Sequence, residues 1–399
     1  MKKILILVIF SGLIISQCTS TKKSNETNLS EKGLQMAIRM ADSEMTFFPR
    51  CSTVDFDSVG AWNYTPGLVS TAMIELWKKT GDKKYYDYAK AYADQFIGDD
   101  GQINGYKCED FNIDKVNSGK FLFELYKNTG DERYKKAIEI LRDQLNDHPR
   151  TSEGGFWHKK RYPHQMWLDG LYMGAPFYAQ FGKEFDEPAA FDDVTNQFLT
   201  VQKHTYNSVA GLNYHGWDES KEQQWADSIT GCSPNFWGRA MGWYSMALVD
   251  VLDFIPENHP DRQKLLDILN SVAAGIKKYQ DADSGLWYQV LDKGNLEGNY
   301  LEASASCMFV YCLQKATRMN YIGKEYRAVA EKGYQGILNK LIKENEDGTI
   351  SLTNVCAVAG LGGNPYRSGS YEYYIGELVR DNDPKGVGPF ILASLEMNK

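Results

Sequence analysis

The sequence lacks several features that would point to common classes of protein. Its seven cysteines include no CxxC pair, and no group of Cys and His has the spacing of metal ligands, so zinc ribbons and thioredoxin-like motifs are excluded. Basic residues number 44 and acidic residues 52, giving a formal net charge of −8. This balance argues against a general nucleic-acid or anionic-membrane binder, which needs a basic face. Strand signals are nearly absent, and residues 349–352 are the clearest short candidate.

What the sequence does have is a large apolar fraction. The 399 residues are 43% hydrophobic and 13% aromatic, which is enough to bury a sizeable core without disulfide bonds. The even number of cysteines after Cys18 would still permit disulfides in an exported protein. Cys307 and Cys312 fall in an apolar helical pattern, which favours buried thiols. The many aromatic rings suit a sugar-binding cleft, although most rings in proteins fill the core.

The N-terminus has the pattern of an export signal. Lys2 and Lys3 precede an apolar run over residues 4–15, which is too short to span a bilayer as a helix, and then Ser16-Gln17-Cys18. We expect residues 1–17 to be a signal peptide and Cys18 to be lipidated as in bacterial lipoproteins, although Gln17 fits that signal poorly and ordinary cleavage is the alternative. Residues 18–30 are polar and predict a flexible tether. The protein is then exported, as a periplasmic protein or a membrane-anchored lipoprotein.

A repeated motif indicates helical hairpins. The sequence TGDKKY at 80–85 recurs 49 residues later as TGDERY at 129–134. Each copy follows apolar residues at i, i+3, i+4 spacing, and Gly-Asp can end one helix and cap the next. A glycine with an apolar or aromatic neighbour follows each hairpin, at Gly101, Gly155, Gly211, Gly285 and Gly348, with gaps of 54, 56, 74 and 63 residues.

The five crossings predict an architecture of repeated hairpins. We expect a sixth hairpin from about residue 369 to residue 396. Hairpins of this kind bury their apolar faces only against neighbours, so they form a solenoid or close into a ring. The repeat length fits neither tetratricopeptide nor ankyrin arrays. We therefore predict one all-α domain over residues 31–399, a closed α/α toroid with a cleft formed by loops at one end.

Two acidic residues are candidates for catalysis. Asp169 lies between Leu168 and Leu171, where an apolar environment would raise the pKa of a carboxyl group and suit it to general-acid work. Asp114 opens the inner helix of the preceding hairpin, so the two carboxylates could face one cleft, as glycosidases require. Each could instead be only a helix N-cap.

Basic and aromatic residues accompany these acids. The run His158–Arg161 follows a glycine crossing beside Trp157 and Trp167, which favours carboxylate recognition over a merely solvated loop. Arg239 and Trp243 lie one turn apart near the start of a helix, where an Arg can bind a carboxylate and a Trp can stack on a sugar. The alternatives are an Arg that caps a neighbouring hairpin and a core Trp. His215 is a lone histidine, for which packing or hydrogen bonding is the default.

Several motifs together resemble one known family. They are HQMWLDGLYMG at 164–174, FWGRAMGW at 236–243, GLWYQVLD at 285–292, GNYLEASAS at 298–306, GSYEYYIGE at 369–377 and DNDPKGVGPF at 381–390. In this order they resemble the unsaturated rhamnogalacturonyl hydrolases of glycoside hydrolase family 105. That family is similar in fold to the unsaturated glucuronyl hydrolases, which implies a six-hairpin (α/α)6 barrel.

The resemblance also implies roles for individual residues. It makes Asp169 the general acid/base and Asp114, in the DxxNxGK segment, the second carboxylate. The residues that it places around the sugar are Trp62, Asn63, His158, Lys159, Trp167, His215, Arg239, Trp243 and Ser370. Asp114 is expected to help keep Asp169 protonated through the proximity of like charges. Neither a cofactor nor a metal is expected.

The implied substrate is an oligosaccharide made by a polysaccharide lyase, with a Δ4,5-unsaturated uronic acid at its non-reducing end. The implied reaction is hydration of the enol ether, with galacturonic acid as the expected sugar. One alternative is an unsaturated glucuronyl hydrolase acting on ulvan or glycosaminoglycan fragments. Others are a non-catalytic glycan-binding lipoprotein, against which both retained carboxylates argue, and a helical scaffold that binds proteins. The oligomeric state stays open.

Overall fold

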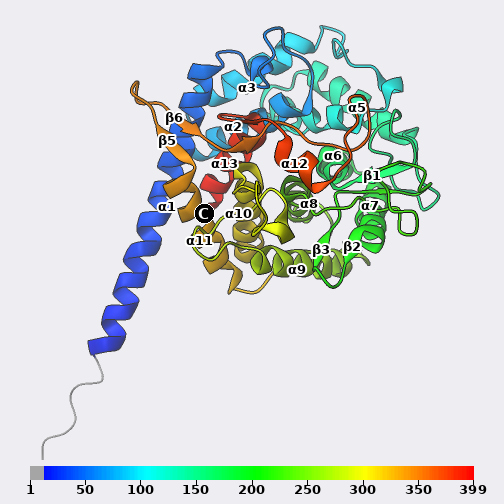
Figure 1. Ribbon diagram of the computed structural model, residues 1–399. Helices are drawn as coiled ribbons and strands as arrows, with labels where there is room; N and C mark the ends of the chain where they lie inside the picture. The colour runs from blue at the N-terminus through cyan, green and yellow to red at the C-terminus, as the bar shows by residue number, and fades with distance from the viewer. Residues whose placement is uncertain (1–12) are drawn as a thin grey trace, which may run out of the picture.

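Two concentric rings of helices make up the protein. The computed structural model describes residues 13–399, with side-chain surroundings from residue 29 onward. In this part of the chain six inner segments form a closed ring (Figure 1): α2 (Tyr64–Thr80), the 3₁₀ helix η3 (Ile113–Gly119) with α4 (Leu122–Thr129), α6 (Leu168–Glu184), α8 (Gly238–Val251), α10 (Ala303–Arg318) and α13 (Pro384–Met397). Each packs on the next, and α13 contacts both α10 and α2, which closes the ring. The predicted six-hairpin (α/α)6 barrel is confirmed.

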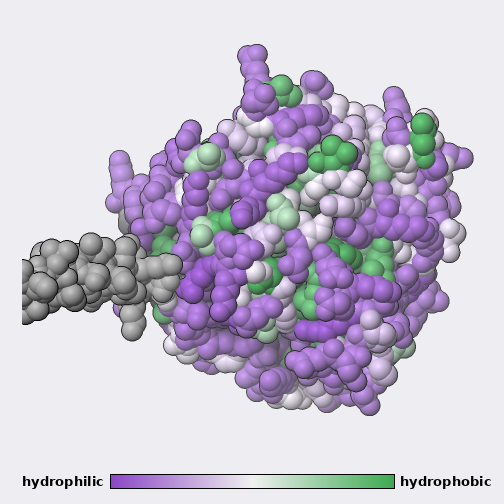
Figure 2. Space-filling view, turned by 90° about the horizontal axis from the view of Figure 1, so that it is seen from below, coloured by the Kyte–Doolittle hydropathy of each residue, from purple (hydrophilic) through white to green (hydrophobic). Residues whose placement is uncertain are grey.

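The outer ring covers the inner one. Its helices are α1 (Leu13–Phe47), α3 (Lys83–Phe96), α5 (Glu132–Asn146), α7 (Ala189–Thr205), α9 (Arg262–Lys278) and α11 (Tyr326–Lys340), which lie at the periphery in Figure 1. The inner helices are buried on nearly all sides, whereas the outer helices expose one polar face. Figure 2 accordingly shows a mostly hydrophilic outer surface on which hydrophobic residues form only small, separate groups.

The repeated TGD motif forms the tip of the hairpins as predicted. Gly81 ends α2 with a φ of 73°, a left-handed conformation that favours glycine, and the carboxylate of Asp82 accepts the backbone N–H of Lys84 at 3.1 Å. Gly130 and Asp131 do the same between α4 and α5, with φ 66° and the N–H of Arg133 at 3.0 Å. The motif therefore ends each inner helix and starts each outer one.

The sixth hairpin differs from the prediction. It was expected within residues 369–396, but that range holds only the short α12 (Tyr371–Gly376) and then the inner helix α13. The outer partner of α13 is α1, from the other end of the chain. Because the hairpin is completed by residues more than 300 positions apart, no local periodicity could reveal it.

The connections carry short antiparallel strand pairs. These are β1 (Gln165–Trp167) with β4 (Gly216–Asp218), β2 (Tyr206–Asn207) with β3 (Leu212–Asn213), β5 (Ile342–Glu344) with β6 (Ile350–Leu352), and β7 (Val355–Cys356) with β8 (Val379–Arg380). The predicted strand is confirmed as β6. The other strands have two or three residues, which is too short for a period of two to show in the sequence.

The N-terminal predictions remain largely open. The predicted signal peptide falls mainly on residues 1–12, and the side chain of Cys18 likewise lies outside the described residues. Helix α1 runs through 18–30, where a flexible tether was expected, so the backbone there is helical instead. No helix in the described part of the chain is both long and apolar enough to cross a membrane. Cys307 and Cys312 are fully buried free thiols, as predicted.

Candidate active site

Seven of the eleven predicted site residues line a cavity of 170 Å³ at one end of the barrel, where the inner helices begin. First-turn residues of different inner helices reach it: Tyr64, Asp114, Asp169, Arg239 and Lys385. The partial positive charge of helix N-termini favours an anion in such a place. A larger hollow of 490 Å³ lies at the opposite end, against the C-terminal turns of these helices, and none of the predicted site residues lines it.

Asp169 lies in the first turn of α6 and faces His215. Its Oδ2 is 3.1 Å from Nε2 of His215, and Nδ1 of that ring is 2.7 Å from the hydroxyl of Tyr374. His215 is completely buried, whereas the side chain of Asp169 is 13% exposed and lines the cavity. The N-cap position of α6 is Trp167, so the N-cap interpretation of Asp169 is wrong. Asp169 is an acidic group held against a buried imidazole and open to a ligand.

Tyr374 is a member of this site that the sequence analysis missed. Its hydroxyl can donate to Nδ1 of His215, which places the ring hydrogen on Nε2, the nitrogen 3.1 Å from Oδ2 of Asp169. Nε2 and Oδ2 are close but not aligned as a hydrogen bond, and neither atom has another hydrogen-bond partner in the described chain. Tyr374 therefore fixes the His215 ring beside Asp169. Tyr374 lies in GSYEYYIGE, one of the motifs that carried the resemblance, so the signal was present.

Asp114 is an ionised carboxylate held by basic neighbours. It forms an ion pair with Lys159, and its Oδ1 is 3.4 Å from Nε2 of His158. Burial acts to raise the pKa of Asp114, but the charges of Lys159 and His158 outweigh it and hold that pKa below its ordinary value. Burial lowers the pKa of His158 to about 4, against the opposing pull of Asp114. Asn112, not Asp114, caps η3, so the N-cap interpretation is wrong here too.

Asp114 and Lys159 form a fixed pair on the wall of the cavity. The charge of Asp114 was expected to help keep Asp169 protonated, an expectation that did not include its ion pair with Lys159. The two side chains present an acceptor and a donor to whatever occupies the cavity.

Aromatic rings form the walls. Trp167 stacks on the ring of His158 with centroids 4.4 Å apart and on Tyr162 at 4.9 Å. Trp243 stacks on Tyr172 at 4.7 Å and is 1% exposed, so it is at once a core residue and the floor of the cavity. Its burial matches the core Trp that was considered as one alternative, and its stacking on a sugar remains a prediction.

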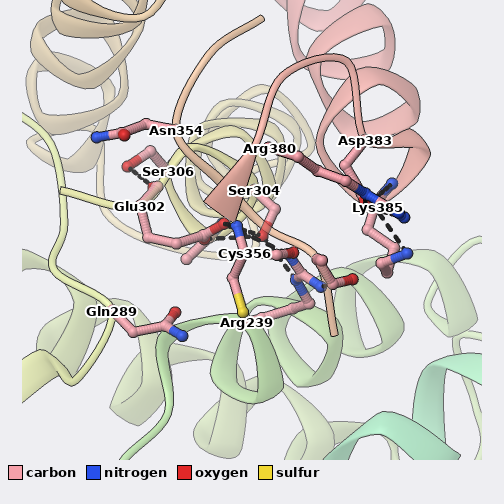
Figure 3. Close-up of polar contacts among 12 residues, drawn as sticks. Arg239, Gln289, Glu302, Ser304, Ser306, Asn354, Cys356, Arg380, Asp383 and Lys385 are labelled. Atoms are coloured by element: carbon pink, nitrogen blue, oxygen red, sulfur yellow. Dashed lines mark hydrogen bonds and ion pairs between the residues drawn. The ribbon is translucent and has the colours of Figure 1, made fainter. Parts of the chain in front are cut away.

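Arg239 is a buried structural cation whose first-turn position also places it at the cavity. Its Nε donates to Ser304 Oγ at 2.8 Å, and its Nη2 forms an ion pair with Glu302 at 3.4 Å and also donates to the Cys356 carbonyl (Figure 3). Glu302 also accepts the backbone N–H of Ala305 at 2.7 Å. The network ties α8 to α10 and β7, and most donors of Arg239 are used within it. This matches the interpretation of an Arg that caps a neighbouring hairpin.

The remaining predicted residues lie elsewhere. Trp62 is 2% exposed, stacks on Tyr92 and donates its indole N–H to the carbonyl of Lys115 at 3.1 Å. With Asn63 it lines an adjoining groove rather than the cavity. Ser370 accepts the N–H of Tyr373 at 3.2 Å as the N-cap of α12 and lines neither space. His215 likewise lies behind Asp169 rather than on the cavity wall.

Two further cations at the cavity were also missed. Arg367 donates to the hydroxyl of Tyr162 at 2.8 Å, and Lys385 is paired with Asp55 and Asp383, each at 3.0 Å. Lys385 lies in DNDPKGVGPF, another motif of the resemblance. Among the described residues no group of three or more His, Cys, Asp and Glu side chains is arranged to hold a metal ion.

Comparison with known proteins agrees with this geometry. The family model Glycosyl Hydrolase Family 88 matches residues 36–399. A solved glycoside hydrolase of family 105 from C. acetobutylicum ATCC 824 is 49% identical, covers 90% of this chain and 98% of its own, and superposes with a TM-score of 0.87. The unsaturated rhamnogalacturonyl hydrolase YesR of Bacillus subtilis is 29% identical over 73% of this chain and 78% of its own length.

A more distant likeness supports the fold alone. The unsaturated glucuronyl hydrolase of Bacillus sp. GL1 is 14% identical, with a TM-score of 0.68 over 93% of this chain and 97% of its own. One conclusion follows from the closed barrel, the two carboxylates in one cavity and the family match across nearly the whole described chain. The chain belongs to Glycosyl Hydrolase Family 88, is related to the family 105 enzymes, and is a glycoside hydrolase.

Proposed function

We propose that this enzyme removes a Δ4,5-unsaturated galacturonic acid from the non-reducing end of rhamnogalacturonan fragments produced by a polysaccharide lyase. The observation that carries the proposal is Asp169, a carboxyl group that faces a small cavity and whose Oδ2 lies 3.1 Å from Nε2 of the buried His215. Support for the substrate comes from the relative YesR, an unsaturated rhamnogalacturonyl hydrolase, and from the basic residues around the cavity.

The chemistry begins with protonation of a carbon. Protonated Asp169 delivers its proton to C4 of the enol ether, and positive charge develops at C5 and the ring oxygen. As the proton leaves, the carboxylate that forms has Nε2 of His215 as a polar neighbour, 3.1 Å from Oδ2. Water then attacks C5, and Asp169 takes a proton from it as the general base, so the acid is regenerated.

The bond to the next sugar breaks without further help from the protein. The C5 hemiketal opens by cleavage of the C5–ring oxygen bond, which leaves a ketone at C5 and a hemiacetal at C1. The hemiacetal expels the sugar behind it as an alcohol while C1 becomes an aldehyde. In this scheme Asp114 and Lys159 orient the uronic acid through its hydroxyl and carboxylate groups.

The test follows the ultraviolet absorbance of the enol ether. The purified protein is incubated with the unsaturated rhamnogalacturonan disaccharide, beside Asp169→Asn and the control Asp192→Asn, an exposed carboxylate in the first turn of α7. We expect the absorbance to fall with wild type and Asp192→Asn, and at least about 100-fold more slowly with Asp169→Asn.

Other outcomes would redirect the assignment. Wild-type turnover by Asp169→Asn would refute its role as the acid. A flat trace from folded wild type that becomes active on glucuronyl-ended fragments would correct the sugar. Flat traces on both substrates would refute the proposed activity and favour glycan binding without catalysis.

A further inference from the structure

A second hollow adjoins the catalytic cavity and shares part of its wall. This groove has a volume of 530 Å³, about three times that of the 170 Å³ cavity. The residues that line both spaces are Tyr64, Asp114, Lys159, Arg161 and Val358. The rest of the groove comes from Asp55, the loop before α2 (residues 60–63), the end of α3 at Phe96, residues 104, 105 and 112 between α3 and η3, and Lys115 in η3. A chain of sugars leaving the cavity can therefore continue directly into the groove.

The groove has an excess of unpaired positive charge. Its acidic residues, Asp55 and Asp114, are both held in ion pairs, Asp55 by Arg380 and Lys385 and Asp114 by Lys159. Lys115 and Arg161 have no ion-pair partner among the described residues. Lys115 donates only to the carbonyl of Gly105 at 3.0 Å, and the guanidinium of Arg161 lies 4.9 Å from the ring centroid of Tyr162. Two cations without an ion-pair partner among the described residues therefore line the same groove.

The groove also offers neutral groups that suit sugars. Asn63 is the N-cap of α2, yet its side chain makes no capping hydrogen bond. Asn104 and Asn112 add side-chain amides to the same surface, and Phe96 adds an aromatic ring. Amide donors and acceptors beside rings can bind hydroxyl groups and pyranose faces.

We infer that this groove binds the leaving part of the substrate and that Lys115 and Arg161 bind a second carboxylate there. The enzyme then prefers an acidic oligosaccharide with another uronic acid beyond the sugar next to the cleaved bond, and it handles a disaccharide less well. The inference rests on the proposed function for its reaction, but the binding itself does not require turnover.

Binding is therefore measured first, with the Asp169→Asn protein, by calorimetry at low and high salt. The probes are an unsaturated tetrasaccharide with two carboxylates and the same molecule with its inner carboxylate reduced to an alcohol. We expect the acidic tetrasaccharide to bind about 5- to 25-fold more tightly, which is about 5-fold for each cation, and the difference to shrink as salt rises. Equal dissociation constants for the two probes would overturn the inference.

Variants then locate the contact. In the same background, Lys115→Met should weaken binding of the acidic tetrasaccharide about 5-fold and leave the reduced one unchanged. The matched control is Lys107→Met, an exposed lysine from the same segment that does not line the groove, and it should bind like the parent. An equal loss for both probes with Lys115→Met would overturn the role of this lysine as a carboxylate ligand.

Turnover separates this inference from the proposed function. With otherwise wild-type protein, Lys115→Met should raise KM for the acidic tetrasaccharide about 5-fold and leave kcat/KM for the disaccharide unchanged. If no unsaturated substrate is hydrolysed but the two probes bind differently, the proposed function fails and the groove assignment stands. If hydrolysis occurs with the same kcat/KM for disaccharide and tetrasaccharide, the groove assignment fails and the function stands.

Discussion

Arg239 gives the sharpest test of how the site is held together. In the variant Arg239→Met, Glu302 loses its only cationic partner among the described residues while staying completely buried. The Cys356 and Ala357 carbonyls and the Ser304 hydroxyl lose a donor as well. Breaking a buried ion pair by removing one partner costs about 3 to 5 kcal/mol, because an uncompensated charge remains in the interior.

This free energy translates into a melting temperature. With an unfolding entropy of about 2.1 cal/mol/K per residue, the roughly 370 residues of the barrel give about 0.8 kcal/mol/K. A loss of 3 to 5 kcal/mol divided by this entropy predicts a decrease in Tm of about 4 to 6 °C. Calorimetry or circular dichroism at constant scan rate measures the decrease.

A second substitution distinguishes a lost charge from lost packing. Arg239→Met combined with Glu302→Gln removes the uncompensated carboxylate. The N–H groups of Ala305 and Cys356 bond to different oxygens of Glu302, so the amide oxygen can still accept one of them but not both. We expect the double variant to recover more than half of the lost Tm. A single variant that melts within 1 °C of wild type, or a double variant that is less stable than the single one, would refute the reasoning.

Two further predictions concern histidines of the same end of the barrel. Burial lowers the pKa of His148 and of His158 to about 4 each, below the usual 6.5, so the unfolded chain binds these protons first as the pH falls. The free energy of unfolding is therefore highest above pH 6.5 and decreases by about 3 kcal/mol for each histidine as the pH falls from about 6.5 to 4. In His148→Gln one of these two contributions is absent, so Tm should fall less steeply across this pH window. Tyr374→Phe removes the hydroxyl beside Nδ1 of His215, and we expect kcat to fall about 5- to 10-fold with KM unchanged. An unchanged slope for His148→Gln, or a Tyr374→Phe effect confined to KM, would contradict them.

Local sequence patterns predicted most of the fold. The TGD tips and the glycine crossings reflect interactions within a few residues, namely helix periodicity, the left-handed glycine and the carboxylate cap, so they can be read along the chain. The sixth hairpin could not be read in this way, because α1 and α13 come from opposite ends of the chain.

The candidate site was predicted unevenly for the same reason. Asp114, Asp169, His158 and Lys159 were found from their motifs and meet in one cavity. Their partners were not found, because an ion pair or hydrogen bond between distant segments leaves no local signal. Tyr374, 159 residues from His215, is the plainest example.

The sequence by itself therefore determined the all-α class, the hairpins formed by neighbouring segments and the two carboxylates that face the cavity, but not the pairing of α1 with α13 that closes the ring. The tertiary structure decided what each charged group is free to do. From the sequence, Arg239 and Lys159 were predicted to be cations available to a substrate. In the folded protein Arg239 is paired with Glu302, and Lys159 is paired with Asp114. Arg161 and Lys115 form no ion pair with any carboxylate of the described chain, so their donors remain available to a ligand. Charge is a property of a residue, whereas its compensation depends on which side chains the closed ring brings within a few ångströms.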